Sequence, residues 1–202
     1  VTAPVPGTFY LAPLPAAEKE VQILEKTVSG TNKAYTGKEA LESTLKSQVS
    51  SAQLIHIASH GLLDELNPLY SSLVFAQTPQ QSENGFLETR EVFNLQLNAD
   101  LVTLSACETG LGKLSQGEGV VGLSRAFFYA GTPAIVVSLW SVADQSTGEL
   151  MKHFYTYLAK GLDKASALRQ AKLQLLQSSE YSHPFFWAPF VLIGDNKPVE
   201  IR

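Results

Sequence analysis

The chain has 202 residues, of which 45% are hydrophobic and 17% are charged, and its formal net charge is −4. These values are typical of one globular α/β domain with a sizeable core. The mild acidity and the lack of a dense Lys/Arg run exclude a surface that neutralises nucleic-acid phosphates. We therefore expect protein partners and no nucleic acid bound directly.

The chain has a single cysteine, which excludes an internal disulfide and a zinc site of the CxxC type. No metal and no other cofactor is expected, and a lone thiol favours a reducing, cytoplasmic location. No signal-peptide pattern and no apolar run of about 18 residues is present, so no membrane association is expected. We interpret the proline-rich residues 1–8 as a linker from a longer chain and residues 9–202 as the domain.

The first part of the chain alternates strand-like and helix-like segments. We predict a strand over residues 9–14, a helix over 16–28, a short strand over 33–36 and a helix over 39–49. The two helices are predicted because their apolar residues recur three and four positions apart. The polar residues 78–84 predict an exposed loop.

Three short, nearly continuous apolar runs occupy residues 54–59, 101–106 and 134–139. Such runs are typical of parallel strands that are covered on both faces. Helix-like segments lie between and after them, at residues 117–130, 145–160 and 164–177, with Gly161 and Asp163 as stop and N-cap signals, and residues 187–194 can close the sheet. This order predicts an α/β fold with a mostly parallel central sheet flanked by helices on both faces.

Two chemically reactive residues, His60 and Cys107, directly follow the first two of these apolar runs. Because reactive groups gather beyond the carboxyl ends of parallel strands, we expect the two side chains on one rim of the sheet. A thiolate is a strong nucleophile, and an imidazole can stabilise it and later protonate a leaving amine. The backbone N–H groups of Gly61 and Cys107 are candidate donors to the oxyanion of a tetrahedral intermediate. Taken singly, a buried thiol and a hydrogen-bonding histidine are the commoner interpretations, so only the pair indicates catalysis.

Five segments resemble the CHAT family, a group of caspase-like domains commonly fused to tetratricopeptide repeats: residues 56–61 (HIASHG), 104–112 (LSACETGLG), 117–144, 167–176 and 183–195 (HPFFWAPFVLIGD). Cys107 follows His60 by 47 residues, similar to the caspase spacing of about 50. The resemblance implies a caspase-like fold and cysteine endopeptidase activity on a protein substrate. It also implies a His60/Cys107 dyad, oxyanion donors at Gly61 and Cys107, and a tetratricopeptide-repeat region in the same or a partner chain.

Substrate selection is expected to depend on residues near the third apolar run. The position two before the nucleophile is acidic in the similar legumains and metacaspases, but here it is Ser105, which supplies no charge. Residues 138–144 resemble a separase segment that reads a basic residue, so Asp144 is a candidate contact for Arg or Lys and equally a candidate helix N-cap. Ser138 begins the strand edge expected to pair with a substrate backbone. Trp140 either lines the pocket or belongs to the core.

We therefore predict a cysteine endopeptidase that cleaves after a basic residue. Two other interpretations stay open: a catalytically silent caspase-like interaction module of a repeat-bearing signalling protein, and a flavodoxin-like nucleotide-binding domain with an inert thiol. The glycine-rich residues 117–122 lack the lysine and the spacing of a P-loop, which disfavours nucleotide binding. His56, inside the first apolar run, is expected to be structural.

Overall fold

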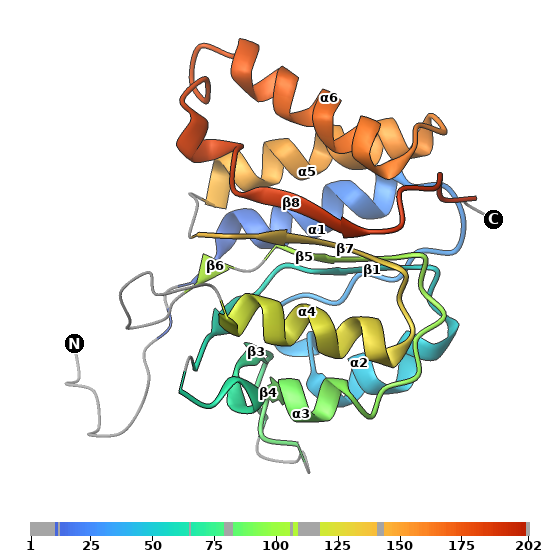
Figure 1. Cartoon of the computed structure of the whole chain (residues 1–202), viewed down its shortest axis with the longest axis vertical. Helices are drawn as coiled ribbons and strands as arrows, with labels where there is room; N and C mark the ends of the chain where they lie inside the picture. Colours follow the sequence, from blue (N-terminus) through green and yellow to red (C-terminus); the bar gives the residue numbers. More distant parts are fainter. Residues whose placement is uncertain are drawn as a thin grey trace.

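The computed structural model describes residues 11, 13–64, 66–78, 83–105, 107–108, 118–140 and 144–200. Its centre is a four-stranded sheet in the order β1-β5-β7-β8 (Figure 1). Its strands are β1 (Leu54–Ile57), β5 (Leu101–Leu104), β7 (Ala134–Ser138) and β8 (Phe190–Gly194). The first three are parallel, and β8 runs antiparallel along β7. The mostly parallel sheet and its closing strand are therefore confirmed.

Helices cover both faces of this sheet (Figure 1). One face carries α1 (Pro15–Thr27), α5 (Asp144–Ala159) and α6 (Lys164–Gln177), and the other carries α2 (Glu42–Gln48), α3 (Thr89–Val92) and α4 (Glu118–Ala130). Successive residues of β5 belong to hydrophobic clusters on opposite faces of the sheet. Leu101 packs with α5 and α6, whereas Val102 packs with α4. Burial on both sides explains why the strands appear in the sequence as continuous apolar runs. The predicted fold class is confirmed.

A second, smaller sheet has the order β4-β3-β2-β6. Its strands are β2 (His60–Leu62), β3 (Ser72–Val74), β4 (Phe86–Glu88) and β6 (Cys107–Glu108). β2 begins three residues after β1 ends, and β6 begins three residues after β5 ends. Strands this short have no detectable periodicity, so the sequence analysis did not predict this sheet.

The predicted helices are confirmed to within one residue at each end for α1, α4, α5 and α6. Asp163 caps α6, because its Oδ1 accepts the N–H of Ser166 at 2.9 Å. Gly161 ends α5 with a φ of +82°, and the N–H of the following Leu162 donates to the Tyr157 carbonyl. This is the left-handed helix stop for which glycine is suited.

One predicted strand is wrong, and one predicted helix begins later than expected. Residues 33–36 form no strand. The helix predicted over 39–49 is divided between two 3-10 turns and α2, which begins only at Glu42. The later start follows from Leu41, whose backbone is extended (φ −97°, ψ 144°) and bridges to Ala76. The 3-10 turns of the described chain are Gly37–Glu39, Val49–Ser51, Pro68–Tyr70 and Pro184–Phe186.

The strand predicted over residues 9–14 is also not found in the part that the structure describes. Leu11, Pro13 and Leu14 belong to no strand, and Pro15 begins α1. The remaining residues of that prediction, and residues 79–82 of the predicted polar loop, lie outside the described residues. Among the described helices, none has the length and apolar character that a membrane span requires.

Candidate active site

The two reactive residues lie on paired strands. β2 and β6 are parallel, and His60 is the register partner of Cys107, as Gly61 is of Glu108. Neighbouring strands lie about 4.8 Å apart, so the backbones of the two candidate residues are adjacent. The side chain of Cys107 lies outside the described part of the chain, so the distance from its sulfur to the His60 ring stays a prediction.

The main sheet explains why these strands meet. β1 and β5 pair up to Ile57 and Leu104, and the N–H of Ser105 then donates to the Ile57 carbonyl at 2.9 Å. The two parallel strands thus leave the large sheet together and pair again as β2 and β6. The candidate site thus continues the β1–β5 pair of the large sheet, in which β5 is buried along its whole length.

β2 is held from both sides. Opposite β6 it pairs with β3, where Gly61 faces Leu73 and Leu62 faces Ser72. Gly61 is buried, and Leu73 is fully buried. The predicted oxyanion donor Gly61 therefore lies at the centre of a three-strand arrangement, while its role and that of the Cys107 N–H stay predictions.

The segment after β2 is held by a carboxylate. Asp64 Oδ1 accepts the N–H groups of Leu66 at 3.0 Å and Asn67 at 2.8 Å. The Asp64 N–H donates to Ser71 Oγ at 3.0 Å, and the Thr89 hydroxyl donates to the Ser71 carbonyl at 2.9 Å. These bonds fix the connection between β2 and β3 next to the candidate site.

The residues predicted to select the substrate are placed as follows. Ser105 is 6% exposed, and its hydroxyl finds no hydrogen-bond partner among the described residues. Asp144 is the first residue of α5; its side chain and residues 141–143 lie outside the described residues. The choice between a pocket carboxylate and a helix cap therefore stays a prediction.

Ser138 is the last residue of β7, and Trp140 follows two residues later. β8 occupies one side of this segment, because Ser138 pairs with Phe190, and the Ser138 hydroxyl donates to the Trp140 carbonyl at 2.6 Å. The register pairing of β7 with β5 ends one residue earlier, at Val137. The Trp140 indole donates to the Phe185 carbonyl at 3.2 Å, and its ring packs against the core of α5 and α6, which fits the core interpretation.

A largely buried chain of polar contacts joins α1, β1, α5 and β5. His56 Nε2 lies 2.7 Å from Glu20 Oε1, and His56 Nδ1 lies 3.1 Å from the Tyr155 hydroxyl. That hydroxyl donates to Thr103 Oγ1 at 3.0 Å, and burial raises the pKa of Tyr155. These contacts support the structural interpretation of His56. Glu20 was not predicted as a polar contact of the core, although its spacing of four residues from Leu24 already indicated an acid on the buried face of a helix.

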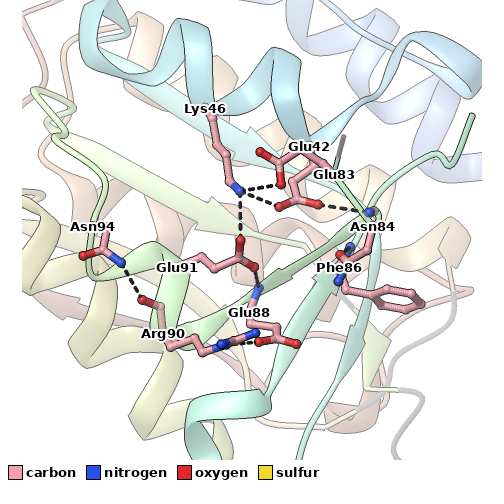
Figure 2. A network of polar contacts seen from close by, with 10 residues as sticks. Glu42, Lys46, Glu83, Asn84, Phe86, Glu88, Arg90, Glu91 and Asn94 are labelled. Carbon is pink, nitrogen blue, oxygen red and sulfur yellow. Dashed lines mark hydrogen bonds and ion pairs between the residues drawn. The ribbon is translucent and has the colours of Figure 1, made fainter. Parts of the chain in front are cut away.

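The described residues include a group of three carboxylates with a geometry that could hold a metal ion: Glu42, Glu83 and Glu91. Figure 2 shows that Lys46 reaches all three. Its Nζ lies 2.7 Å from Glu42, 3.1 Å from Glu83 and 2.9 Å from Glu91. A positive charge is therefore already present where a cation would bind, and the group is an ion-pair cluster.

The charges of this cluster shift the pKa values of Lys46 and Glu91. Partial burial would lower the pKa of Lys46, but its hydrogen bonds to the three carboxylates raise it overall. Burial would raise the pKa of Glu91, yet the Glu88 N–H and the Lys46 ammonium lower it. Glu42 Oε2 also accepts the N–H of Gly85 at 3.0 Å, so the cluster ties the start of β4 to α2.

The chain is similar to a known domain family and to two much longer proteins. A model of the CHAT domain family matches residues 4–195. Tetratricopeptide repeat protein 28 of Homo sapiens is 26% identical over 216 residues, which covers 91% of this chain and 8% of that protein. The Mus musculus protein of the same name is 25% identical, with 91% of this chain and 9% of that protein covered. The chain thus spans less than a tenth of these relatives.

Proposed function

The chain belongs to the CHAT domain family, which is caspase-like, and from this premise we propose that it is a cysteine endopeptidase with a His60/Cys107 dyad. The observation that carries the proposal is the parallel pairing of β2 with β6, in which His60 is the register partner of Cys107. A nucleophile and its base must come within hydrogen-bonding reach, and adjacent backbone positions on neighbouring strands allow this.

The proposed reaction uses the two residues in turn. The Cys107 thiolate attacks the carbonyl carbon of a peptide bond, and the backbone N–H groups of Gly61 and Cys107 stabilise the oxyanion. His60, which has taken the thiol proton, gives it to the departing amine as the C–N bond breaks. Water then hydrolyses the acyl-enzyme, releasing the acid and restoring the thiol.

The proposed substrate is a protein with a basic residue on the acyl side of the cleaved bond. Ser105 is buried and uncharged, so the acid that would bind a guanidinium must come from elsewhere. Asp144 begins α5, six residues after β7 ends, and a carboxylate there can bind Arg or Lys. In this arrangement Ser138 begins the segment that pairs with the substrate, and Trp140 lies within that segment.

The names of the relatives support a proposed partner. Both contain the words tetratricopeptide repeat, and most of each relative lies outside the region matched here. We propose that a tetratricopeptide-repeat region in the same or a partner chain presents the substrate to this domain. The proposed compartment is the cytoplasm, where the lone thiol stays reduced.

A catalytically silent interaction module is the second candidate, because the names of the relatives describe repeats and no activity. A peptide that ends in Arg and carries a thiol-reactive group separates the two. Cys107 is the only cysteine, so covalent labelling measured by mass spectrometry reports on it alone. A peptidase should react about a hundredfold faster than its His60→Ala variant, whereas His153→Ala, on the distant part of α5, should react like the wild type. Equal rates in all three proteins would favour the silent module.

A further inference from the structure

An exposed surface of mixed apolar and basic character lies on α4 and on the 3-10 turn that packs beside it. Its large apolar residues are between 44% and 76% exposed: Leu69, Tyr70, Val121 and Tyr129. They are four of the eleven large apolar residues that are exposed in the described part of the chain. Single exposed apolar residues are normal, but a contiguous group is typical of a surface that binds another protein. We call this group the α4 surface.

Two contacts make the α4 surface contiguous. Pro68 begins the 3-10 turn and lies directly against Gly122 of α4, where an added Cβ would come within 3.3 Å of the Pro68 side chain. At the other end of α4, the Tyr129 and Phe93 rings meet edge to face, with their centroids 5.4 Å apart. The turn, α3 and α4 also contact one another, so their exposed residues form one surface.

The charge carried by the α4 surface is positive. Arg125, in the middle of α4, is exposed and makes no ion pair with the residues that the structure describes. Arg90 lies over the Tyr70 ring, 5.4 Å from its centroid, and its charge is balanced by an ion pair with Glu88. Within the described residues, Arg125 thus leaves one unbalanced positive charge on this surface, although the whole chain has a net charge of −4.

The α4 surface has the shape and composition of a helix-binding site. Val121, Arg125 and Tyr129 are spaced four residues apart, so they form one row along the exposed side of α4. Rows with this spacing are the ridges by which one helix packs against another. Tyrosine and arginine are also among the residue types that contribute most to binding at protein interfaces. An α-helix of another molecule is therefore the element that fits this row.

The position of Arg125 indicates which molecule supplies that helix. In a twofold dimer in which α4 packs on its own copy, the centres of the two rows meet, which brings the Arg125 side chains of both copies together. Like charges in contact are unfavourable, whereas a carboxylate opposite Arg125 is favourable. Permanent interfaces are also largely apolar, while a mixture of tyrosine and arginine fits a partner that associates and dissociates.

We propose that the α4 surface binds an amphipathic helix of a separate partner protein, with a carboxylate against Arg125 and apolar side chains against Val121 and Tyr129. The bound helix contacts the connection that follows His60 and β2, and it contacts α4, which follows Cys107 and β6. It therefore touches chain segments that follow both residues of the proposed dyad. Binding itself requires no cleavage chemistry, so the proposal does not depend on the proposed function.

Two synthetic helical peptides, added to the full natural polypeptide, test this proposal. Both have leucines at alternating intervals of three and four residues, and one has glutamates beside them where the other has lysines. Fluorescence anisotropy should show that the acidic peptide binds at least about tenfold more tightly, although the protein chain is itself acidic. Arg125→Glu should reverse this preference. Arg169→Glu, at an exposed position of α6 on the opposite face of the sheet, should leave it unchanged.

A matched pair of apolar positions locates the binding site. Val121→Ser should weaken binding of the acidic peptide about tenfold, because a central apolar contact of the interface is lost. Leu176→Ser, on α6 and also 44% exposed, should leave the affinity unchanged. Cys107→Ala should bind the peptide as the wild type does, so a failure of the proposed dyad is distinguishable from a failure of this proposal.

Three results would overturn the proposal. The first is equal or absent binding of the two peptides, and the second is an Arg125→Glu variant that keeps the wild-type preference. The third is another occupant of the α4 surface. Sedimentation that shows a dimer dissociated by Arg125→Glu would assign the surface to a second copy. Peptide binding by the 202-residue chain but not by the full polypeptide would assign it to another part of the same polypeptide.

Discussion

The two sheets of the protein differ in how they are stabilised and in what they carry. In the large sheet, Leu101 of β5 and Ile135 of β7 are fully buried between helical layers. The small sheet has strands of two or three residues, and it holds the paired positions His60 and Cys107. The burial that stabilises the fold is thus concentrated in one sheet, and the candidate chemistry lies in its short continuation. This division is common where reactive loops are positioned by a rigid scaffold.

The largest expected effect compares one residue from each sheet. Leu101→Ala removes a fully buried side chain from the central strand pair and should lower the free energy of unfolding by about 3 kcal/mol. Cys107→Ala replaces one small side chain in a two-residue strand and should change it by less than about 0.5 kcal/mol. Urea unfolding curves of both variants measure the difference. Equal losses would show that the small sheet contributes to stability as much as the large one.

The next effect concerns substrate preference. If Asp144 binds the basic residue of the substrate, Asp144→Ala should lower the specificity constant for such substrates about a hundredfold. A helix cap would instead cost about 1 kcal/mol of stability and leave the order of substrates unchanged. Profiling a peptide library with both proteins decides between these roles. A wild-type preference for acidic or apolar residues would reject the pocket role of Asp144.

A variant of Lys46 tests whether the ion pairs of its cluster stabilise the small sheet. Lys46→Met leaves the fully buried Glu42 carboxylate without its cation and should lower the free energy of unfolding by about 2 kcal/mol. Lys152→Met removes an exposed pair with Glu149 and should cost less than about 0.5 kcal/mol. Chemical unfolding of the two variants provides the comparison. A Lys46 variant as stable as the Lys152 variant would mean that the cluster stabilises little.

The smallest effect is a pH dependence of stability. Because Glu91 has a lowered pKa in the folded state, its contribution is complete above its unfolded pKa of about 4.3 and is lost as the pH falls through the folded value. Below the unfolded pKa, the free energy of unfolding should therefore fall less steeply with decreasing pH in Glu91→Gln than in the wild type. The difference in slope should be less than about 1.4 kcal/mol per pH unit, which is the limit for one proton. Unfolding measured between about pH 3 and pH 7 tests this. An unchanged acid slope would contradict it.

The two sheets also differ in how far the sequence predicted them. The apolar runs at residues 54–59, 101–106 and 134–139 predicted three strands, because both faces of β5 and β7 are buried and one face of β1 is buried while the other is half-buried. The ends of the first two runs then predicted that His60 and Cys107 would be neighbours on the rim, and the backbone register agrees. Residues 33–36 include Tyr35 and Thr36, which favour strands, but they form no strand, since strand formation there depends on a pairing partner.

The long-range contacts were not predictable from local patterns. β3 and β4 are three residues long, and the pairings of β3 with β2 and of β4 with β3 join separate segments of the chain. The Lys46 cluster joins residues from α2, from the segment before β4 and from α3, and only the Glu42–Lys46 spacing was visible as a helical pair. The specificity of the site depends on Asp144, whose local sequence fits a pocket residue and a helix cap equally well.

The proposed active site lies in the small sheet. The most direct test is to measure how fast the full natural polypeptide and its variants cleave peptides that contain a basic residue. Cys107→Ala should abolish cleavage, and His60→Ala should reduce it at least about a hundredfold. Both variants should unfold at about the same urea concentration as the wild type, because each replaces a single side chain in a strand of two or three residues. Cleavage that persists in the Cys107→Ala variant would contradict the account.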